Sequence, residues 1–360
     1  MSDAARSSIP PVAIVGAGQW GTALAQVLCA AGRPVRLWAR DPGLVARIAG
    51  EHRNPAYLPG IPLHPDIAVS HDLGGTLAGA AVVILAVPSH GMAATARRCR
   101  DHLAEGCVVV SAAKGFDAAS GSTMTQLLRE ELGATCSPRV AAMSGPNIAI
   151  EIARGLPAAT VVASGDPTVA AFVRDVLTGT QLRVYSSADV VGVEYGGALK
   201  NVVAIAAGMG DGLDAGDNGK AALITRGLAE MTRLGVRAGA QPLTFAGLTG
   251  LGDCVVTCTS PHSRNRRLGE AIGRGQTLAE VEAGMFMVAE GVNAARGGQA
   301  LGRRFGVETP IVDQVCAVLF EGKPIAEAIG DLMNRDARDE LAELRLPGAP
   351  EVIVAPAASA

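Results

Sequence analysis

The stretch VAIVGAGQWGTALA, residues Val12–Ala25, decides how the first half of the chain folds. A short apolar run leads into Gly16, Gly18 and Gly21, which have the spacing G-x-G-x-x-G, and a helical pattern follows. In such a strand–turn–helix unit the first glycine permits the tight turn, the second lets a pyrophosphate approach the backbone, and the third lets helix and strand pack closely. The free amides at the helix N-terminus then face the phosphates. The stretch therefore predicts a dinucleotide-binding unit.

Strand-like runs alternate with helical patterns as far as Ser187. We expect further strands in PVRLWAR, AVVILAVP, CVVVSAAKG, RVAAMSG and AATVVAS, and helices over Trp20–Ala31, STMTQLLREEL and PTVAAFVRDVL. Alternation of this kind, with nearly continuous apolar strands, is typical of a parallel sheet covered by helices on both faces. The first half is therefore predicted to be an α/β Rossmann domain over residues 10–187.

Only helical patterns remain after Ser187. They are GGALKNVVAIAAG, KAALITRGLAEMTRLG, TLAEVEAG, VNAARGGQALGRRFG, IVDQVCAVLFEG and PIAEAIGDLM. We therefore expect an all-helical substrate and catalytic domain over residues 188–345, with flexible tails at residues 1–9 and 346–360.

Composition limits the classes of function. The 360 residues are 49% hydrophobic but only 3% aromatic, and the net charge of -3 argues against nucleic acid as a main partner. Each apolar run is interrupted before the ~18 residues that a membrane span needs, and the N-terminus has no apolar signal-peptide core. We expect a cytoplasmic protein without an integral membrane segment. The oligomeric state stays open, with a homodimer as the candidate.

The cysteines indicate packing rather than metal binding. Seven are scattered along the chain, and an odd number does not suggest a disulfide framework. Cys254, Cys258 and His262 are spaced four apart and could share a helix face, but they supply three ligands with no obvious fourth. We expect these residues in the core and no metal.

The end of the second strand bears on the choice between NAD and NADP. A carboxylate there suits the ribose hydroxyls of NAD, whereas a cation suits the 2′-phosphate of NADP. The strand ends with Arg40 followed by Asp41. The alternative interpretation is that Arg40 and Asp41 form an exposed pair on a loop and do not contact the cofactor. The order favours NADP, because Arg40 comes first.

Lys200 is the one charged residue of GGALKNVVAIAAG, and its neighbours three and four positions away carry no carboxylate. Such a lysine must reach water, find a partner from elsewhere in the fold, or take part in chemistry. By itself it is more often structural than catalytic.

Three other segments place polar groups on loops that could bind an anion. Lys114 follows a predicted strand in SAAKGF, and Gly145 and Asn147 lie in the turn of MSGPN. SPHSRNRRLG contains Ser263, Arg264 and Asn265, a set able to hold a phosphate. Taken singly, each segment is typical of a surface turn.

Together these segments resemble one family over nearly the whole chain, the bacterial NAD(P)-dependent glycerol-3-phosphate dehydrogenases. The series GGALKN, AALITRGL, GLGD, TCTS and SRNRR, in that order, is the most specific part of the resemblance. It implies a Rossmann domain followed by a helical domain of the 6-phosphogluconate-dehydrogenase-like plan, with the active site between them. The implied reaction interconverts sn-glycerol 3-phosphate and dihydroxyacetone phosphate, which supplies glycerophospholipid biosynthesis.

The resemblance also implies residue roles. Lys200 is matched to the catalytic general acid and base. Substrate contacts are matched to Lys114, Gly145, Asn147, Lys200, Asp253, Ser263, Arg264 and Asn265. Cofactor contacts are matched to Gln19, Trp20, Arg40, Lys114, Ala149, Arg264, Val288 and Glu290, in addition to the three glycines. Asn147 departs from the usual Ser or Thr, Ile148 from Phe, and Gln19 from a frequent Ser.

Chemistry and resemblance agree on Lys200. Oxidation of a secondary alcohol needs a hydride acceptor and a base, and burial of a lysine favours the neutral amine that serves as that base. We expect Asn201 and Asp253 to orient it. A dehydrogenase acting on a β-hydroxyacid or on ketopantoate is the nearest alternative, although a carboxylate substrate does not need the SRNRR cluster. A redox-sensing module that binds the dinucleotide without turnover would not need the lysine.

Overall fold

A single eight-stranded sheet organises the first half of the chain. The computed structural model describes residues 11–117, 120–133, 139–179, 181–285 and 289–336, so the tails expected at 1–9 and 346–360 lie outside the described residues. The sheet order is β3-β2-β1-β4-β5-β6-β7-β8. The strands are β1 (Val12–Val15), β2 (Val35–Trp38), β3 (Ala68–Ser70), β4 (Val82–Leu85), β5 (Val108–Ser111), β6 (Val140–Ser144), β7 (Ala158–Ala163) and β8 (Leu182–Ser187).

The expectation of a purely parallel sheet is wrong at one junction. The strands from β3 to β6 run parallel, but β6 pairs with β7 in the antiparallel sense, and β8 then runs parallel to β7. The helix that joins β6 to β7, α7 (Ala149–Ala153), has only five residues. It is too short to carry the chain back along the sheet, so β7 starts at the edge where β6 ends.

Strands β3 and β8 were not expected from the sequence. Strand β3 has three residues and no buried position, and β8 alternates between buried and exposed residues along its first half. Both are the outermost strands of the sheet. Neither has the continuous apolar run that marks a strand buried on both faces.

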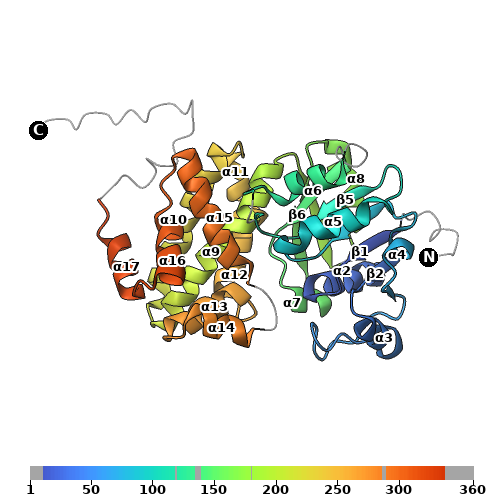
Figure 1. Cartoon of the computed structure of the whole chain (residues 1–360), viewed down its shortest axis with the longest axis horizontal. Coiled ribbons are helices and arrows are strands. Elements are labelled where there is room, and N and C mark those ends of the chain that lie inside the picture. The colour runs from blue at the N-terminus through green and yellow to red at the C-terminus, as the bar shows by residue number, and fades with distance from the viewer. Residues whose placement is uncertain (1–10, 118–119, 134–138, 180, 286–288, 337–360) are drawn as a thin grey trace, which may run out of the picture.

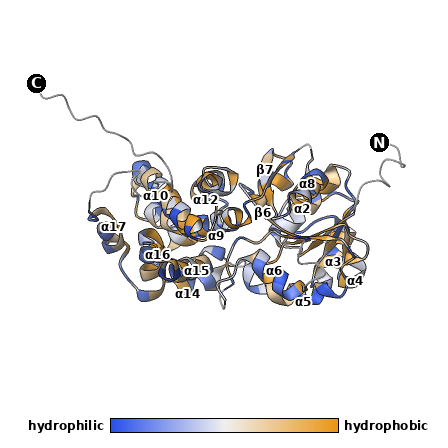
Figure 2. Cartoon of the chain, turned by 90° about the horizontal axis from the view of Figure 1, so that it is seen from above, coloured by the Kyte–Doolittle hydropathy of each residue, from blue (hydrophilic) through white to orange (hydrophobic). Residues whose placement is uncertain are grey.

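Helices cover both faces of the sheet. On β1, Val12 and Ile14 face one apolar cluster, and Ala13 and Val15 face another, as the alternation of a strand requires. The first cluster is completed by α2 (Gln19–Ala30), α3 (Pro42–Glu51), α7 and α8 (Pro167–Leu177). The second is completed by α4 (Leu73–Leu77), α5 (Met92–Arg100) and α6 (Met124–Leu132). Figure 2 shows the apolar strands between these layers.

The second half is helical throughout its described residues and is built around α9 (Val190–Gly212) (Figure 1). The other helices are α10 (Gly216–Arg237), α11 (Pro242–Phe245), α12 (Asp253–Thr259), α13 (Arg264–Gly273), α14 (Leu278–Gly284), α15 (Glu290–Phe305), α16 (Pro310–Glu321) and α17 (Ile325–Met333), with a π-helical turn at Leu248–Gly252.

Helix α9 is more apolar than the sequence analysis allowed. It has 23 residues and a mean hydropathy of 1.3 over its best window, which is enough to cross a membrane by length and composition. However, 83% of that window is buried by the rest of the protein, as expected for the central helix of a globular bundle.

Cys254 and Cys258 lie in the core, as expected. Their sulfur atoms are 4.0 Å apart, and the contact with Cys254, followed by burial, raises the pKa of the Cys258 thiol well above its usual range. His262 lies in the turn after α12 and is exposed, so the three residues do not share a helix face and the expectation of a core position is wrong for His262. No group of three or more potential metal-ligating side chains is found in the part of the chain that the structure describes.

Candidate active site

The glycine turn between β1 and α2 has the shape that a pyrophosphate needs. Gly16 has a φ of 115°, and a Cβ there would lie 2.6 Å from the carbonyl oxygen of Ala86. A Cβ at Gly21 would collide with the carbonyl oxygen of Gly16, whereas the Cα of Gly18 faces open space. Gly18 is the N-cap of α2 and brings no capping side chain. The turn therefore fits a dinucleotide, with free amides beside an open approach.

The other cofactor residues predicted near this turn lie at the same edge of the sheet. Gln19 and Trp20 open α2, and Arg40 is exposed after β2, the strand beside β1. Asp41 is the N-cap of α3, where its Oδ1 accepts a hydrogen bond of 2.8 Å from the amide of Gly43. This cap turns the Asp41 carboxylate toward its own helix.

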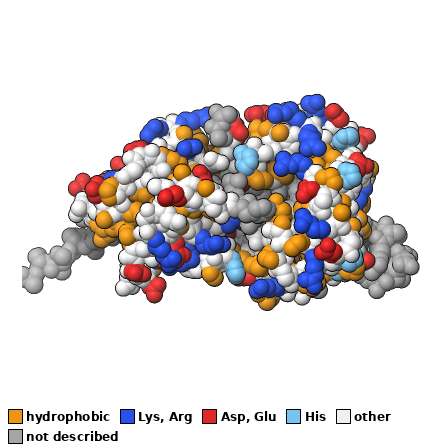
Figure 3. Space-filling view, turned by 60° about the horizontal axis from the view of Figure 1, so that its bottom comes forward, with side chains coloured by type: hydrophobic (Ala, Val, Ile, Leu, Met, Phe, Trp, Pro, Cys, Tyr) orange, Lys and Arg blue, Asp and Glu red, His pale blue; other side chains and the backbone are white. Residues whose placement is uncertain are grey.

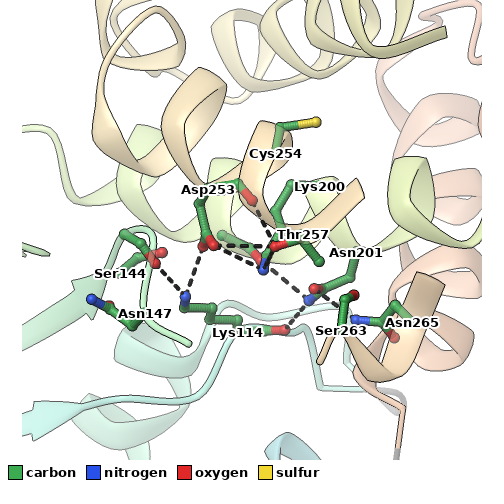
Figure 4. Close-up of polar contacts among 12 residues, drawn as sticks. Lys114, Ser144, Asn147, Lys200, Asn201, Asp253, Cys254, Thr257, Ser263 and Asn265 are labelled. Carbon is green, nitrogen blue, oxygen red and sulfur yellow. Dashed lines mark hydrogen bonds and ion pairs between the residues drawn. The ribbon is translucent and has the colours of Figure 1, made fainter. Parts of the chain in front are cut away.

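Lys200 is paired with residues of another helix, α12. Its Nζ donates hydrogen bonds to Oδ1 of Asp253 at 3.0 Å and to Oγ1 of Thr257 at 2.6 Å (Figure 4). Lys200 and Asp253 are 5% and 1% exposed. Asp253 and Thr257 are four residues apart on α12, so they present both acceptors on one helix face. The buried ammonium is thus paired and held in one position.

A second lysine meets the same carboxylate from the sheet half of the molecule. Lys114, which follows β5, donates from Nζ to Oδ2 of Asp253 and to the carbonyl oxygen of Gly145, both at 2.7 Å. Burial lowers the pKa of Lys114 to about 8; Asp253 opposes this shift, and the charge of Lys200 adds to it. Asp253 therefore bridges two cations that come from different halves of the chain.

Two glycines before Lys200 allow this assembly. A Cβ at Gly196 would lie 2.9 Å from the carbonyl oxygen of Thr249 in the π-helical turn, and a Cβ at Gly197 would lie 2.5 Å from Oγ of Ser144 at the end of β6. The glycine pair therefore lets α9 pack closely on both halves. This is why small residues precede the lysine in the sequence.

A chain of amides supports the main chain around the lysines. Asn201 donates to the carbonyl oxygen of Lys114 at 3.2 Å and accepts from Nδ2 of Asn265 at 2.9 Å. Oδ1 of Asn265 in turn accepts from the amide of Gly291 at 3.0 Å. The expectation that Asn201 orients Lys200 is therefore not met, because its amide holds Lys114 and Asn265 instead.

The remaining predicted substrate residues surround this centre. Asn147 is fixed against β7, with Oδ1 accepting from Oγ1 of Thr160 at 3.1 Å. Gly145 has a φ of 148°, and a Cβ there would lie 3.0 Å from Cα of Thr160. Ser263 is the N-cap of α13, and Arg264 is the first residue of that helix.

Glu290 links the two halves at the cofactor side. Burial lowers the pKa of the Arg264 guanidinium and the charge of Glu290 opposes the shift. The Glu290 carboxylate also accepts from the amide of Ser89 at 3.1 Å and from its hydroxyl at 2.6 Å. Ala149, another predicted cofactor residue, opens α7 and is buried, and Val288 lies outside the described residues.

Thr257 and Ser89 are site residues that the sequence analysis missed. Thr257 could have been found from its i, i+4 spacing to Asp253 in DCVVT. Ser89 has no comparable signal, because Glu290 is 201 positions away. Basic, acidic and apolar side chains are interspersed over both halves on the face shown in Figure 3, so no surface of one sign marks the site on that face.

Comparison with known proteins agrees with this geometry. The models described as the N-terminus and the C-terminus of NAD-dependent glycerol-3-phosphate dehydrogenase match residues 11–170 and 189–330. The chain belongs to this family. A Moorella thermoacetica protein named glycerol-3-phosphate dehydrogenase (NAD(P)+) is 46% identical over 330 residues, which cover 92% of this chain and 97% of the relative.

Two further members extend the comparison. A Salinibacter ruber protein, named glycerol-3-phosphate dehydrogenase (NAD(P)+) 2, is 47% identical over 91% of this chain and 96% of its own length. The crystal structure of a Coxiella burnetii glycerol-3-phosphate dehydrogenase matches with a TM-score of 0.85 and 36% identity, over 91% of this chain and 99% of that one. The family likeness thus covers both halves and the site between them.

Proposed function

We propose that this chain interconverts sn-glycerol 3-phosphate and dihydroxyacetone phosphate with NAD(P)(H). The observation that carries the proposal is the buried Lys200 ammonium, held between Asp253 and Thr257 beside the second lysine, Lys114, in a member of this family. The alternative dehydrogenases act on carboxylates and do not need the additional cations of the SRNRR segment.

Lys200 is proposed as the general acid and base. When bound, the nicotinamide supplies or accepts the hydride at carbon 2 of the substrate. In the oxidation, neutral Lys200 takes the proton of the hydroxyl group as the C–H bond breaks and the carbonyl forms. In the reduction, the Lys200 ammonium donates that proton to the developing alkoxide. Asp253 stabilises the ammonium form, and Thr257 keeps Nζ aimed in one direction.

The substrate phosphate is proposed to lie against Lys114, Ser263, Arg264 and Asn265. Arg264 is partly buried at the first turn of α13, where a guanidinium and helix amides together suit a phosphate. Lys114 contacts Asp253, the partner of Lys200, so it is placed to neutralise charge near the reacting carbon.

The cofactor is proposed to bind at the glycine turn, with NADPH preferred over NADH. Gly16, Gly18, Gln19, Trp20 and Gly21 would contact the pyrophosphate side, and Arg40 the 2′-phosphate. The cap formed by Asp41 supports this preference, because the hydrogen bond from the amide of Gly43 occupies one carboxylate oxygen and orients the carboxylate toward α3. Ala149, Val288, Glu290 and Arg264 are proposed as the remaining contacts.

The cellular setting is proposed to be cytoplasmic glycerophospholipid biosynthesis.

The protein is proposed to be a homodimer. An apolar cavity of about 310 Å³ lies between α9, α10, α16 and α17. Ile329 and Met333 in its wall are 38% and 78% exposed, and a second copy would cover them. Light scattering of the purified protein tests this, and Met333→Glu should favour the monomer.

The direct test is loss of absorbance at 340 nm with dihydroxyacetone phosphate and each reduced cofactor. The proposal predicts oxidation of both NADPH and NADH with this substrate and little with unphosphorylated dihydroxyacetone or with ketopantoate. Equal rates with the phosphorylated and unphosphorylated ketones would refute the phosphate site. Turnover of ketopantoate alone would identify the protein as a dehydrogenase that acts on carboxylates.

A further inference from the structure

A buried amide lies directly behind the glycine turn. Asn54, in the loop that follows α3, is 0% exposed. Its Nδ2 donates to the carbonyl oxygen of Ala17 at 3.0 Å and to Oγ1 of Thr22 at 2.8 Å. Oγ1 of Thr22 donates to the same Ala17 carbonyl at 3.2 Å. Two side chains from different segments therefore converge on one carbonyl oxygen in the middle of the turn.

Holding this carbonyl sets the direction of the next amide. The described chain contains no cis peptide bond, and in a planar trans peptide the carbonyl and the following N–H point in opposite directions. Because the Ala17 oxygen is drawn toward Asn54 and Thr22, the N–H of Gly18 points away from them. The space beside Gly18 is open, with no atom within 4 Å of the position of a Cβ.

The loop around Asn54 is itself well fixed. The carbonyl oxygen of Asn54 accepts from the amides of Tyr57 and Leu58 at 3.2 and 2.7 Å, and Leu58 is fully buried. Asn54 therefore brings its amide to the glycine turn from a rigid base. Asn54 would therefore influence a bound dinucleotide indirectly, through the backbone of the glycine turn.

We propose that Asn54 and Thr22 are positioning residues that aim the Gly18 amide at the pyrophosphate and so determine the affinity for the dinucleotide. This inference rests on the proposed cofactor site at the glycine turn. The pyrophosphate is common to NADPH and NADH, so both residues act equally on the two cofactors, in contrast to Arg40. They contact neither the substrate cluster nor Lys200, so they affect binding rather than the chemical step.

The experiment measures the dissociation constants of NADPH and NADH for the variants Asn54→Ala and Thr22→Val by fluorescence titration. Misdirecting one hydrogen bond to a charged group should weaken both cofactors by about tenfold or more in Asn54→Ala and by about threefold or more in Thr22→Val. At saturating cofactor, kcat and the KM for dihydroxyacetone phosphate should stay close to those of the wild type. Effects of the two changes should not add, because both act on one carbonyl.

Thr76→Val is the matched control. Thr76 is also buried, and its hydroxyl donates to the carbonyl oxygen of Asp72 at 2.6 Å in α4, away from the turn. This variant should bind both cofactors like the wild type.

Three results would overturn the inference: unchanged cofactor dissociation constants in folded Asn54→Ala and Thr22→Val proteins, a loss restricted to kcat, or a Thr22→Val protein that does not fold. The last would show that the hydroxyl serves the core. Titration of the cofactor does not require turnover, so a wild type that binds NADPH without reducing the triose phosphate would refute the proposed function and leave this inference testable.

Discussion

The sheet half and the helical half prepare their parts of the site in different ways. In the sheet half, one continuous stretch from Gly16 to Gly21 forms a surface of backbone amides and open space. In the helical half, Lys200 and Asp253 come from two helices, and Lys114 joins them across a sequence separation of 139 residues. The first surface is neutral and local, whereas the second is charged and assembled by tertiary packing.

This difference indicates how each half responds to change. A backbone surface tolerates side-chain substitution around it and loses affinity gradually. A buried charge cluster depends on every partner, because an unpaired charge away from water is strongly unfavourable. Substitutions in the cluster should therefore affect catalysis and stability together, and substitutions around the glycine turn should affect cofactor affinity.

Asp253→Asn should have the largest effect, because Asp253 is the partner of both lysines. Loss of the carboxylate leaves the buried Lys200 and the half-buried Lys114 without their counter-charge, which should lower the free energy of unfolding by about 3–5 kcal/mol. Without the group that stabilises the Lys200 ammonium, kcat should fall on the order of 10²–10⁴-fold. Denaturant titration and the 340 nm assay measure the two effects.

Asp211→Asn is the control for this change. Asp211 also accepts from two cations, Lys220 and Arg266, each at 2.6 Å, but it lies near the far end of α9. It should keep most of the wild-type kcat. A comparable loss in both variants would mean that the Asp253 effect is one of folding alone.

Arg264→Ala should weaken the substrate and the cofactor together. Loss of a charge-assisted contact to phosphate is worth about 1.5–3 kcal/mol, which corresponds to roughly 10- to 150-fold in kcat/KM for dihydroxyacetone phosphate. The exposed Arg267, three residues along the same helix, is the control position. If Arg264→Ala kept the wild-type KM for dihydroxyacetone phosphate, Arg264 would not belong to the phosphate site.

Lys114 should give the cluster a pH dependence. Its pKa is lowered from 10.5 to about 8, so it is charged below pH 8 and loses its proton above it. We expect kcat/KM for the anionic substrate to fall above pH 8, by no more than about tenfold per pH unit. Because the native state binds fewer protons than the unfolded chain between pH 8 and 10.5, the contribution of Lys114 to stability should rise with pH over that range.

Lys114→Arg checks the assignment of this pH dependence. A guanidinium keeps its charge at these pH values, so the decrease above pH 8 should disappear in a variant that still binds substrate. An unchanged pH profile would assign the transition to another group.

Arg40→Ala should have the smallest effect and should act on the sheet half alone. Its proposed contact with the 2′-phosphate is exposed and screened by salt, so we expect a loss of about 1–2 kcal/mol for NADPH, with NADH almost unchanged. Arg47→Ala, an exposed arginine on α3, is the control. Equal losses for both cofactors would mean that Arg40 only supports the loop, and a wild type that prefers NADH would favour Asp41 as the ribose contact.

The same contrast explains what could be predicted from the sequence. The glycine turn could be predicted because its three glycines lie within one strand–turn–helix unit, whereas the contact of Asn54 with Ala17, 37 positions away, could not. The reversal at β7 could not be predicted either, because it follows from the short connection through α7 and not from the strand residues. Asp253 was identified as a partner of Lys200, but its contact with Lys114 and the contact of Ser89 with Glu290 depend on how distant segments pack. For the same reason, the sequence predicts that Asn201 orients Lys200, whereas its amide contacts the main chain of Lys114.

In the proposed mechanism, Lys200 carries the proton transfer while the sheet half binds the cofactor independently. The most direct measurement compares wild type and Lys200→Ala in NADPH titration and in reduction of dihydroxyacetone phosphate. We expect a nearly unchanged NADPH dissociation constant and a kcat lower by on the order of 10²–10⁴-fold. A variant that keeps more than about a tenth of the wild-type kcat would contradict this mechanism and remove Lys200 from it.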